Sequence, residues 1–221
     1  MIRKCLIRKR LTREESRDLT RQRLLDAAEK LFAKKGLVAT SVEDIAEAAG
    51  YTRGAFYSNF AEKNDLFIDW LRRDHERAHK ELNALLSDDD LPPEQLQQRA
   101  REFYTKLNRN NECFMNWTEA RLLAVRDAKF RSKLTALTVE KRGQLAQFIV
   151  YFFQRLGVPP PAAPEAIAMA FMSMAQGVQL MMLSTPQDMG ADRAESVLTL
   201  FVDALMHSAR FQADARTTSG G

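Results

Sequence analysis

Residues 40–60 read TSVEDIAEAAGYTRGAFYSNF, and this stretch contains two short helical patterns on either side of a glycine. Thr40 and Glu43 have the spacing of a capping box, in which each side chain satisfies a free backbone N–H at the start of a helix. The apolar residues that follow share one helix face: Val42, Ile45, Ala46 and Ala49. Gly50 tolerates the positive φ of a tight turn. The pattern predicts a helix over residues 41–49, a turn and a second helix over residues 52–60, which together form a helix-turn-helix motif.

The second predicted helix has an apolar side and a polar side. Phe56 and Phe60 are spaced to pack inward against the preceding helices. The residues left outside are mostly polar: Arg53, Ala55, Tyr57, Ser58 and Asn59. Cationic, phenolic, hydroxyl and amide groups suit phosphates and base edges. A helical hairpin with no nucleic-acid role shows the same pattern and is the alternative interpretation.

The positive charge of the chain is concentrated at its amino-terminal end. Residues 1–63 contain 14 Lys and Arg against 9 Asp and Glu, whereas residues 64–221 contain 19 against 20, for a whole-chain net charge of +4. A basic end joined to a near-neutral body is typical of a polyanion-binding module attached to a separate core. A solvated basic tail without a partner would give the same balance.

Apolar residues recur at helical spacing along the rest of the chain. Hydrophobic residues make up 45% of the sequence and charged residues 28%, which is enough to bury a sizeable core. Further helices are predicted near residues 24–35, 63–86, 93–109, 112–125, 129–156, 164–184 and 192–210. No segment alternates with period two, so the sequence predicts an all-α protein of about nine helices.

Several classes of protein are excluded by composition. We find no apolar run of the roughly 20 residues that a membrane span needs, and residues 1–10 carry charge where a signal peptide is apolar. Cys5 and Cys113 form neither a disulfide framework nor a zinc pattern, which fits a reducing cytoplasm. The chain contains no Walker-type loop, dinucleotide fingerprint or nucleophile elbow, so no cofactor is expected.

One motif indicates a different function. Residues 75–79 read HERAH and match the HExxH signature of zinc proteases. His75 and His79 would lie on one helix face, where two imidazoles can bind zinc. The neighbouring residues are charged on nearly every side, and the third histidine, His207, is distant in the sequence. We therefore expect no metal site and no enzyme, with a metalloenzyme and a helical metal- or ligand-binding protein without DNA function as alternatives.

Residues 40–60, followed by Lys63 and Leu66, closely resemble the DNA-binding signature of the TetR family of transcriptional regulators, and the resemblance extends over about residues 20–70. It implies eight DNA-contacting positions: Thr40, Thr52, Arg53, Gly54, Tyr57, Ser58, Asn59 and Lys63. Thr40 would hold a phosphate through its hydroxyl and backbone N–H, and Lys63 would clamp another phosphate. The Asn59-Phe60 pair departs from the His-Phe of many members, which affects sequence preference.

The resemblance also implies a domain plan and a regulatory mode. Residues 20–62 would form the helix-turn-helix domain and residues 63–211 a helical bundle for ligand sensing and dimerisation. The composition of the chain, rather than the resemblance, predicts a basic, flexible arm over residues 1–19 and a disordered tail over residues 212–221. The protein would be a cytoplasmic homodimeric repressor, released from a palindromic double-stranded DNA operator by a small-molecule effector. The predicted dimer interface comprises Phe171, Met174, Val178, Met181, Val197, Phe201 and Leu205.

Aromatic and thioether side chains of the second domain indicate an apolar effector pocket between the fourth and eighth helices. The candidate walls are Trp70, Phe103, Tyr104, Leu107, Met115, Trp117 and Met172. Glu119 or His79 would provide the polar contact to an uncharged or cationic aromatic effector. The same side chains would also serve as ordinary core packing.

Overall fold

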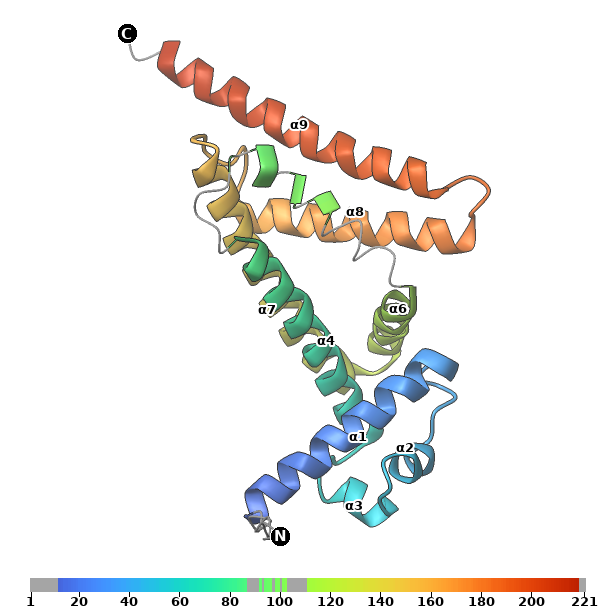
Figure 1. The fold of residues 1–221 in the computed structure, drawn as a ribbon. Helices are drawn as coiled ribbons and strands as arrows, with labels where there is room; N and C mark the ends of the chain where they lie inside the picture. The colour runs from blue at the N-terminus through green and yellow to red at the C-terminus, as the bar shows by residue number, and fades with distance from the viewer. Residues whose placement is uncertain are drawn as a thin grey trace, which may run out of the picture. The chain divides into compact units, whose positions relative to one another are not determined.

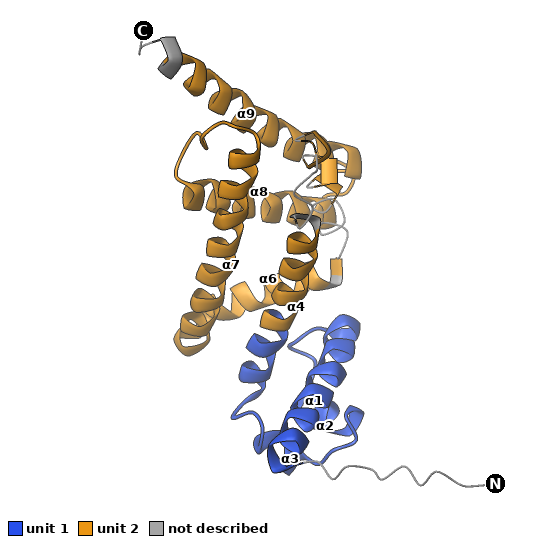
Figure 2. Ribbon diagram, turned by 60° about the vertical axis from the view of Figure 1, so that its left-hand side comes forward, with its two compact units in different colours: residues 1–71 blue, residues 72–221 orange. Residues whose placement is uncertain are grey.

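The computed structural model describes residues 12–86, 92, 94–96, 98–99, 101–102 and 111–218. In this part of the chain every regular element is a helix, as the sequence predicts (Figure 1). The assigned helices are α1 (Arg13–Lys35), α2 (Val42–Ala48), α3 (Arg53–Tyr57), α4 (Lys63–Leu86), α6 (Asn111–Arg126), α7 (Ala128–Arg155), α8 (Pro164–Ser184) and α9 (Ala191–Thr218). They divide between two compact units, residues 1–71 and residues 72–221 (Figure 2).

The amino-terminal unit is built on an aromatic core shared by α1 and the start of α4. Phe32 lies edge-on to Phe67 and Trp70, with ring centroids 5.3 and 5.9 Å away. Phe67 and Trp70 stack on each other, and none of the three side chains is more than 5% exposed. The start of α4 therefore belongs to this unit, which ends at Leu71 rather than at the predicted residue 62.

Helix α1 begins earlier than the sequence pattern suggested. The Thr12 hydroxyl accepts a hydrogen bond from the Glu15 backbone N–H, and the Glu15 carboxylate accepts one from the Thr12 N–H at 2.7 Å. This capping box stabilises the first turn, so residues 13–19, expected to be part of a flexible arm, are helical. Gly36 ends the helix with a φ of 73°. Residues 1–11 lie outside the described part of the chain.

The capping box of α2 lies one residue later than predicted. The Ser41 hydroxyl accepts from the Asp44 N–H at 3.0 Å, and the Asp44 carboxylate accepts from the Ser41 N–H at 2.8 Å. The proposed pairing of Thr40 with Glu43 is therefore wrong. Thr40 is instead 1% exposed, and its hydroxyl donates to the Gly36 carbonyl at 2.7 Å.

The second unit packs its remaining helices around α7. Helix α7 contacts α6 and α8, and α8 contacts α9. The main buried cluster joins residues from α4, α7, α8 and α9, including Leu82, Phe148, Phe152, Phe153, Ile167 and Met206. Helix α9 continues through residues 212–218, which were expected to be disordered. No glycine or proline occurs between residues 191 and 218, so nothing local ends this helix earlier.

Helix α8 is apolar enough by length and composition to cross a membrane, with a mean hydropathy of 1.5. Gln176 and Gln179 interrupt this run, so it is not an unbroken apolar stretch in the sequence. Its mean hydropathy nevertheless stays high. Only 22% of the segment is buried within the protomer. A core helix of a soluble protein passes the same test, and α8 contacts α7 and α9. Much of its apolar surface nevertheless remains exposed.

Candidate nucleic-acid interface and ligand pocket

Helix α3 is anchored to the amino-terminal unit by Phe56 and by Phe60, which follows the helix. Phe56 is 0% exposed and Phe60 is 3% exposed, with their ring centroids 5.6 Å apart. The Thr52 hydroxyl accepts from the Ala55 N–H at 3.2 Å and so caps the helix. The preceding turn contains Gly50 with a φ of 74°. The short helix therefore has a fixed orientation, with the inward packing that the sequence predicted.

Arg21 fixes the end of α3 to α1 and α4. Its guanidinium donates to the Asn59 carbonyl at 2.8 Å and forms an ion pair with Asp69. The same group lies 4.2 Å from the centroid of the Phe60 ring, within the range of a cation–π contact. No local sequence pattern identifies Arg21 as a structural residue, because its partners lie 38 or more positions away in the sequence.

The opposite face of α3 presents polar groups to solvent. The Arg53 guanidinium lies 2.8 Å from the Glu43 carboxylate and 3.4 Å from the Tyr57 hydroxyl. The hydrogen bond to Tyr57, followed by the charge of Glu43, raises the pKa of Arg53. Tyr57 is 47% exposed, and the Ser58 hydroxyl donates to the Gly54 carbonyl at 3.0 Å. Because solvent screens an exposed ion pair, Arg53 can exchange Glu43 for a phosphate at small cost.

Three of the expected DNA contacts are buried or half-buried and bond to the protein itself. The Lys63 ammonium donates to the carbonyls of Leu37 and Thr40 at 2.8 and 2.7 Å. The Thr40 side chain is buried, as described above. The Asn59 amide donates to the Ala55 carbonyl at 2.8 Å and is half-buried. In this conformation these side chains stabilise the turns around α2 and α3, which leaves the exposed face of α3 as the candidate interface.

The second unit encloses a cavity of about 150 Å³ between α4, α6, α7 and α8. Its apolar walls include Leu82, Phe114, Trp117, Leu145, Phe171 and Met172. Its polar lining includes Asp74, His75, His79, Lys141, Gln144 and Gln179. Three of the predicted effector-binding residues thus come together here, namely Trp117, Met172 and His79. We call this cavity the ligand pocket.

The other predicted pocket residues lie elsewhere. Trp70 belongs to the aromatic core of the amino-terminal unit. Met115 is 47% exposed, and neither it nor Glu119 is among the described residues that line the ligand pocket. The remaining three predicted wall residues fall outside the described part of the chain: Phe103, Tyr104 and Leu107.

The polar groups of the ligand pocket form a connected cluster that the sequence analysis did not find. Asp74 accepts hydrogen bonds from the Cys113 thiol at 2.9 Å and the Trp117 indole N–H at 3.1 Å. Burial and the neighbouring Asp74 raise the pKa of Cys113, so its thiol stays protonated. Burial, with the charge of Lys141, lowers the pKa of His75 to about 4. The Lys141 ammonium lies 4.4 Å from the Trp117 ring centroid, and burial lowers its pKa.

The two histidines of the HExxH motif both line this pocket. Their ring centroids are 6.3 Å apart, and the Asn83 amide donates to His79 Nε2 at 3.0 Å. Among the described residues, no group of three or more His, Cys, Asp or Glu side chains is placed to hold a metal ion. The geometry therefore places His75 and His79 in the wall of the pocket.

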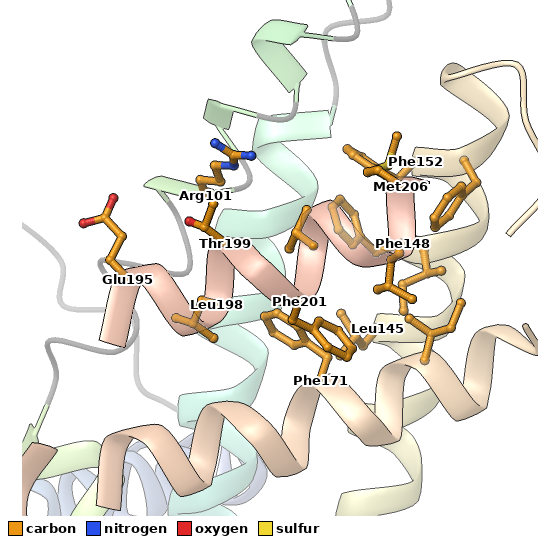
Figure 3. Close-up of a pocket in the computed structure, with 15 residues that line it drawn as sticks. Arg101, Leu145, Phe148, Phe152, Phe171, Glu195, Leu198, Thr199, Phe201 and Met206 are labelled. Carbon is orange, nitrogen blue, oxygen red and sulfur yellow. The ribbon is translucent and has the colours of Figure 1, made fainter. Parts of the chain in front are cut away.

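A second cavity of about 110 Å³ lies between α7, α8 and α9 (Figure 3). Arg101, Thr199 and Glu195 gather at one end, and phenylalanines together with aliphatic side chains line the rest. Phe171 and Phe201 face each other with ring centroids 6.1 Å apart. Both cavities are lined by Leu145 and Phe171, which therefore form the wall that they share.

Several residues predicted for the dimer interface face the interior of the protomer instead. Phe171, Phe201 and Leu205 line the second cavity, and Val178 is 5% exposed. Met174 and Val197 are half-buried, whereas Met181 is 42% exposed. The large apolar side chains that α8 and α9 do expose are Met169, Leu180, Met181, Leu183, Leu200 and Phe211. Helical spacing did not distinguish the sides of α8 and α9 that face outward from those that face the interior of the protomer.

Comparison with known proteins identifies the amino-terminal unit. Residues 24–69 match the family model described as "Bacterial regulatory proteins, tetR family". The transcriptional regulator AcrR of Shigella flexneri is 50% identical over 60 residues, which span 27% of each protein. The chain thus covers about a quarter of the length of that curated relative.

The fold of the larger part of the chain is found in solved structures. A TetR-family regulator from Rhodococcus sp. superposes with a TM-score of 0.68 at 23% identity, covering 86% of this chain and 99% of that protein. The complex of SmeT with triclosan superposes with a TM-score of 0.61 at 24% identity, covering 84% and 91%. SmeT is the repressor of the multidrug efflux pump SmeDEF of Stenotrophomonas maltophilia. These similarities show the fold of the second unit as well as that of the first.

Proposed function

We propose that the chain, whose residues 24–69 match the TetR family of transcriptional regulators, is a cytoplasmic repressor of this family that binds a palindromic DNA operator as a homodimer. A small-molecule effector bound in the second unit would release it from the operator. The observation that carries the proposal is the exposed polar face of α3, held on a rigid helix-turn-helix platform in the segment that matches the family.

The proposed DNA contacts come from that face and from the start of α3. Arg53 and Tyr57 extend into solvent, where they can meet base edges and phosphates. Thr52 and Gly54 at the helix start are also exposed, and Gly54 allows close approach of the backbone to DNA. Ser58 follows on the same side. We assign Thr40, Asn59 and Lys63 to the support of this surface rather than to direct contact.

The ligand pocket supports an effector-responsive regulator. Helix α4 contributes Phe67 and Trp70 to the core of the amino-terminal unit and then contributes Asp74, His75 and Leu82 to the pocket wall. A ligand that displaces α4 would therefore act on the same helix that packs under the DNA-binding elements. SmeT, a protein of the same fold, was solved with triclosan, which agrees with a ligand role for this unit.

The apolar surface of α8 and α9 supports dimerisation. Leu180 and Met181 on α8 are 49% and 42% exposed, and Leu200 on α9 is 70% exposed. Gly177 on α8 and Ala204 on α9 are also exposed, and their small size allows close helix packing. A second copy of the chain would cover this surface in a four-helix arrangement, and two-fold symmetry would place two recognition helices on a palindromic operator.

A gel-shift titration tests the proposal with the DNA upstream of the protein's own gene. We expect specific binding that weakens with salt, and an Arg53→Met variant with lower affinity and a salt slope smaller by about one unit. Arg126→Met is the matched control, because Arg126 is exposed on α6 of the second unit. Equal affinity of both variants, or no preference for specific over random DNA, would contradict the proposed function.

A further inference from the structure

The charges of the ligand pocket suggest what kind of ligand it accepts. Asp74 uses its Oδ2 to accept from Cys113 and Trp117, and the neighbouring Glu140 forms an ion pair with Arg72 at 2.5 Å. The carboxylates near the pocket are therefore already engaged with donors on the protein. A cationic ligand would bring a second positive charge close to Lys141, which lines the same pocket, and this repulsion is unfavourable in a partly buried site.

The positive group of the pocket has a different environment. The Lys141 ammonium rests on the Trp117 ring at 4.4 Å from its centroid. Within the described part of the chain no ion pair joins this ammonium to a carboxylate at 4.0 Å or less, although the negative charge of Asp74 and, more weakly, the positive charge of Arg121 both act on it. A partly buried ammonium gains most from an anion that brings charge-assisted hydrogen bonds.

Buried polar atoms in the wall also lack partners. His75 is 6% exposed, and its Nε2 atom has no hydrogen-bond partner among the described residues. The Oε1 atom of half-buried Gln144 also has no partner of good geometry, and the Gln144 side chain lies close enough to His75 to act on the pKa of the imidazole. Both side chains line the ligand pocket. An unpaired buried acceptor is costly, so a ligand hydroxyl that donates to either atom would be favoured.

The volume and the walls limit the rest of the ligand. A cavity of about 150 Å³ lined by apolar side chains is large enough to bind benzene. Phe114, Trp117 and Phe171 provide aromatic surfaces for one ring. The cavity therefore fits a single aromatic ring with small polar substituents.

We propose that the ligand pocket binds a hydroxylated monocyclic aromatic acid, with the carboxylate on Lys141 and the hydroxyl donating to His75 or Gln144. This inference rests on the proposed function for its regulatory meaning, and it replaces the expectation of an uncharged or cationic effector. The ligand's charge, rather than its shape, distinguishes the two ideas.

Isosteric probes isolate the charge. Isothermal titration of the full chain with 4-hydroxybenzoate, 4-hydroxybenzamide and 4-hydroxybenzamidine compares charges of −1, 0 and +1 on nearly one shape. We expect the acid to bind at least about tenfold more tightly than the amide, as one charge-assisted contact provides, and the amidine to bind most weakly. Benzoate should bind less tightly than 4-hydroxybenzoate, because it lacks the donor for His75 and Gln144.

Variants then assign the effect to one residue. In Lys141→Met the preference for acid over amide should disappear, and Lys141→Arg should restore it. Lys129→Met, at an exposed position on the same helix, is the control and should behave as the native protein. Thermal unfolding of the Met variant, compared with that of Lys129→Met, shows whether it is folded.

Three results would overturn the proposal: an amidine that binds as tightly as the acid, an acid preference that survives Lys141→Met, or no acid binding up to about 10 mM. The gel-shift titration without ligand reports on the proposed function separately. Loss of operator binding with Lys141-dependent acid binding intact would contradict the regulator and leave the pocket assignment standing. Operator binding without Lys141-dependent acid binding would support the regulator and contradict the pocket assignment.

Discussion

Lys63→Met distinguishes a structural lysine from a phosphate clamp. The ammonium donates to the Leu37 and Thr40 carbonyls at 2.8 and 2.7 Å in a partly buried site. Hydrogen bonds to a charged group contribute about 1.5–3 kcal/mol each. Water can reach this site once the lysine is removed, so we expect the substitution to cost the amino-terminal unit about 2 kcal/mol in total. With a urea slope of about 2 kcal/mol/M, the unfolding midpoint should fall by roughly 1 M.

The two tryptophans allow this unit to be followed alone. The chain has 2 Trp, and Trp70 lies in the amino-terminal unit whereas Trp117 lies in the second. In a Trp117→Phe background, fluorescence during urea unfolding reports the environment of Trp70 only. Lys30→Met provides the control, because Lys30 is exposed on α1 and should shift the midpoint very little.

The salt dependence of operator binding supplies the opposing test. A structural lysine predicts that Lys63→Met lowers stability but leaves the slope of log affinity against log salt unchanged. A phosphate contact predicts the reverse, with a slope smaller by about one unit and native stability. If the second pattern is observed, the hydrogen bonds of Lys63 to Leu37 and Thr40 do not persist in solution, and the assignment of this residue is wrong.

Three further predictions concern the second unit. His75 has a pKa of about 4 in the folded protein against 6.5 in the unfolded chain, so the unfolded chain binds one more proton between these pH values. The free energy of unfolding should therefore fall by up to about 3 kcal/mol from pH 6.5 to pH 4. Urea unfolding of His75→Leu should show a smaller fall. Phe171→Ala should join the two cavities, so calorimetry should show biphenyl-4-carboxylate gaining affinity relative to 4-hydroxybenzoate. Leu200→Glu should give monomers by light scattering. Leu122→Glu, which changes an exposed side chain of α6, is the control and should stay dimeric.

Local patterns in the sequence predicted the elements well. The 3.6-residue spacing of Ile45, Phe56 and Phe60 identified which sides of α2 and α3 are buried, because periodicity reports burial directly. The capping residue was placed one position early, since Thr40 and Ser41 are both acceptable caps. Only the packing of Thr40 beneath the Gly36 carbonyl distinguishes them, and that contact depends on the three-dimensional turn.

Contacts between distant segments could not be predicted in the same way. Asp74 and Lys141 lie 67 positions apart in the sequence and line one pocket only because α4 and α7 are neighbours. Phe171 and Phe201 were assigned to a subunit interface, because an apolar face at helical spacing does not reveal whether it meets its own chain or another. The buried polar cluster also runs against the usual preference for apolar residues, so composition alone gave no reason to expect it.

The continuity of α4 limits what an effector can do. A helix transmits displacement along its axis better than a loop does, and only residues 72 and 73 separate Leu71 in the amino-terminal unit from Asp74 in the pocket wall. An effector changes operator affinity only by the difference in its own affinity for the DNA-bound and free conformations. A tenfold release from DNA therefore needs about 1.4 kcal/mol of differential binding, which one charge-assisted contact to Lys141 can supply if only one conformation permits it. By the same linkage, operator DNA must weaken effector binding tenfold, so a ligand whose affinity is unaffected by operator cannot be the inducer.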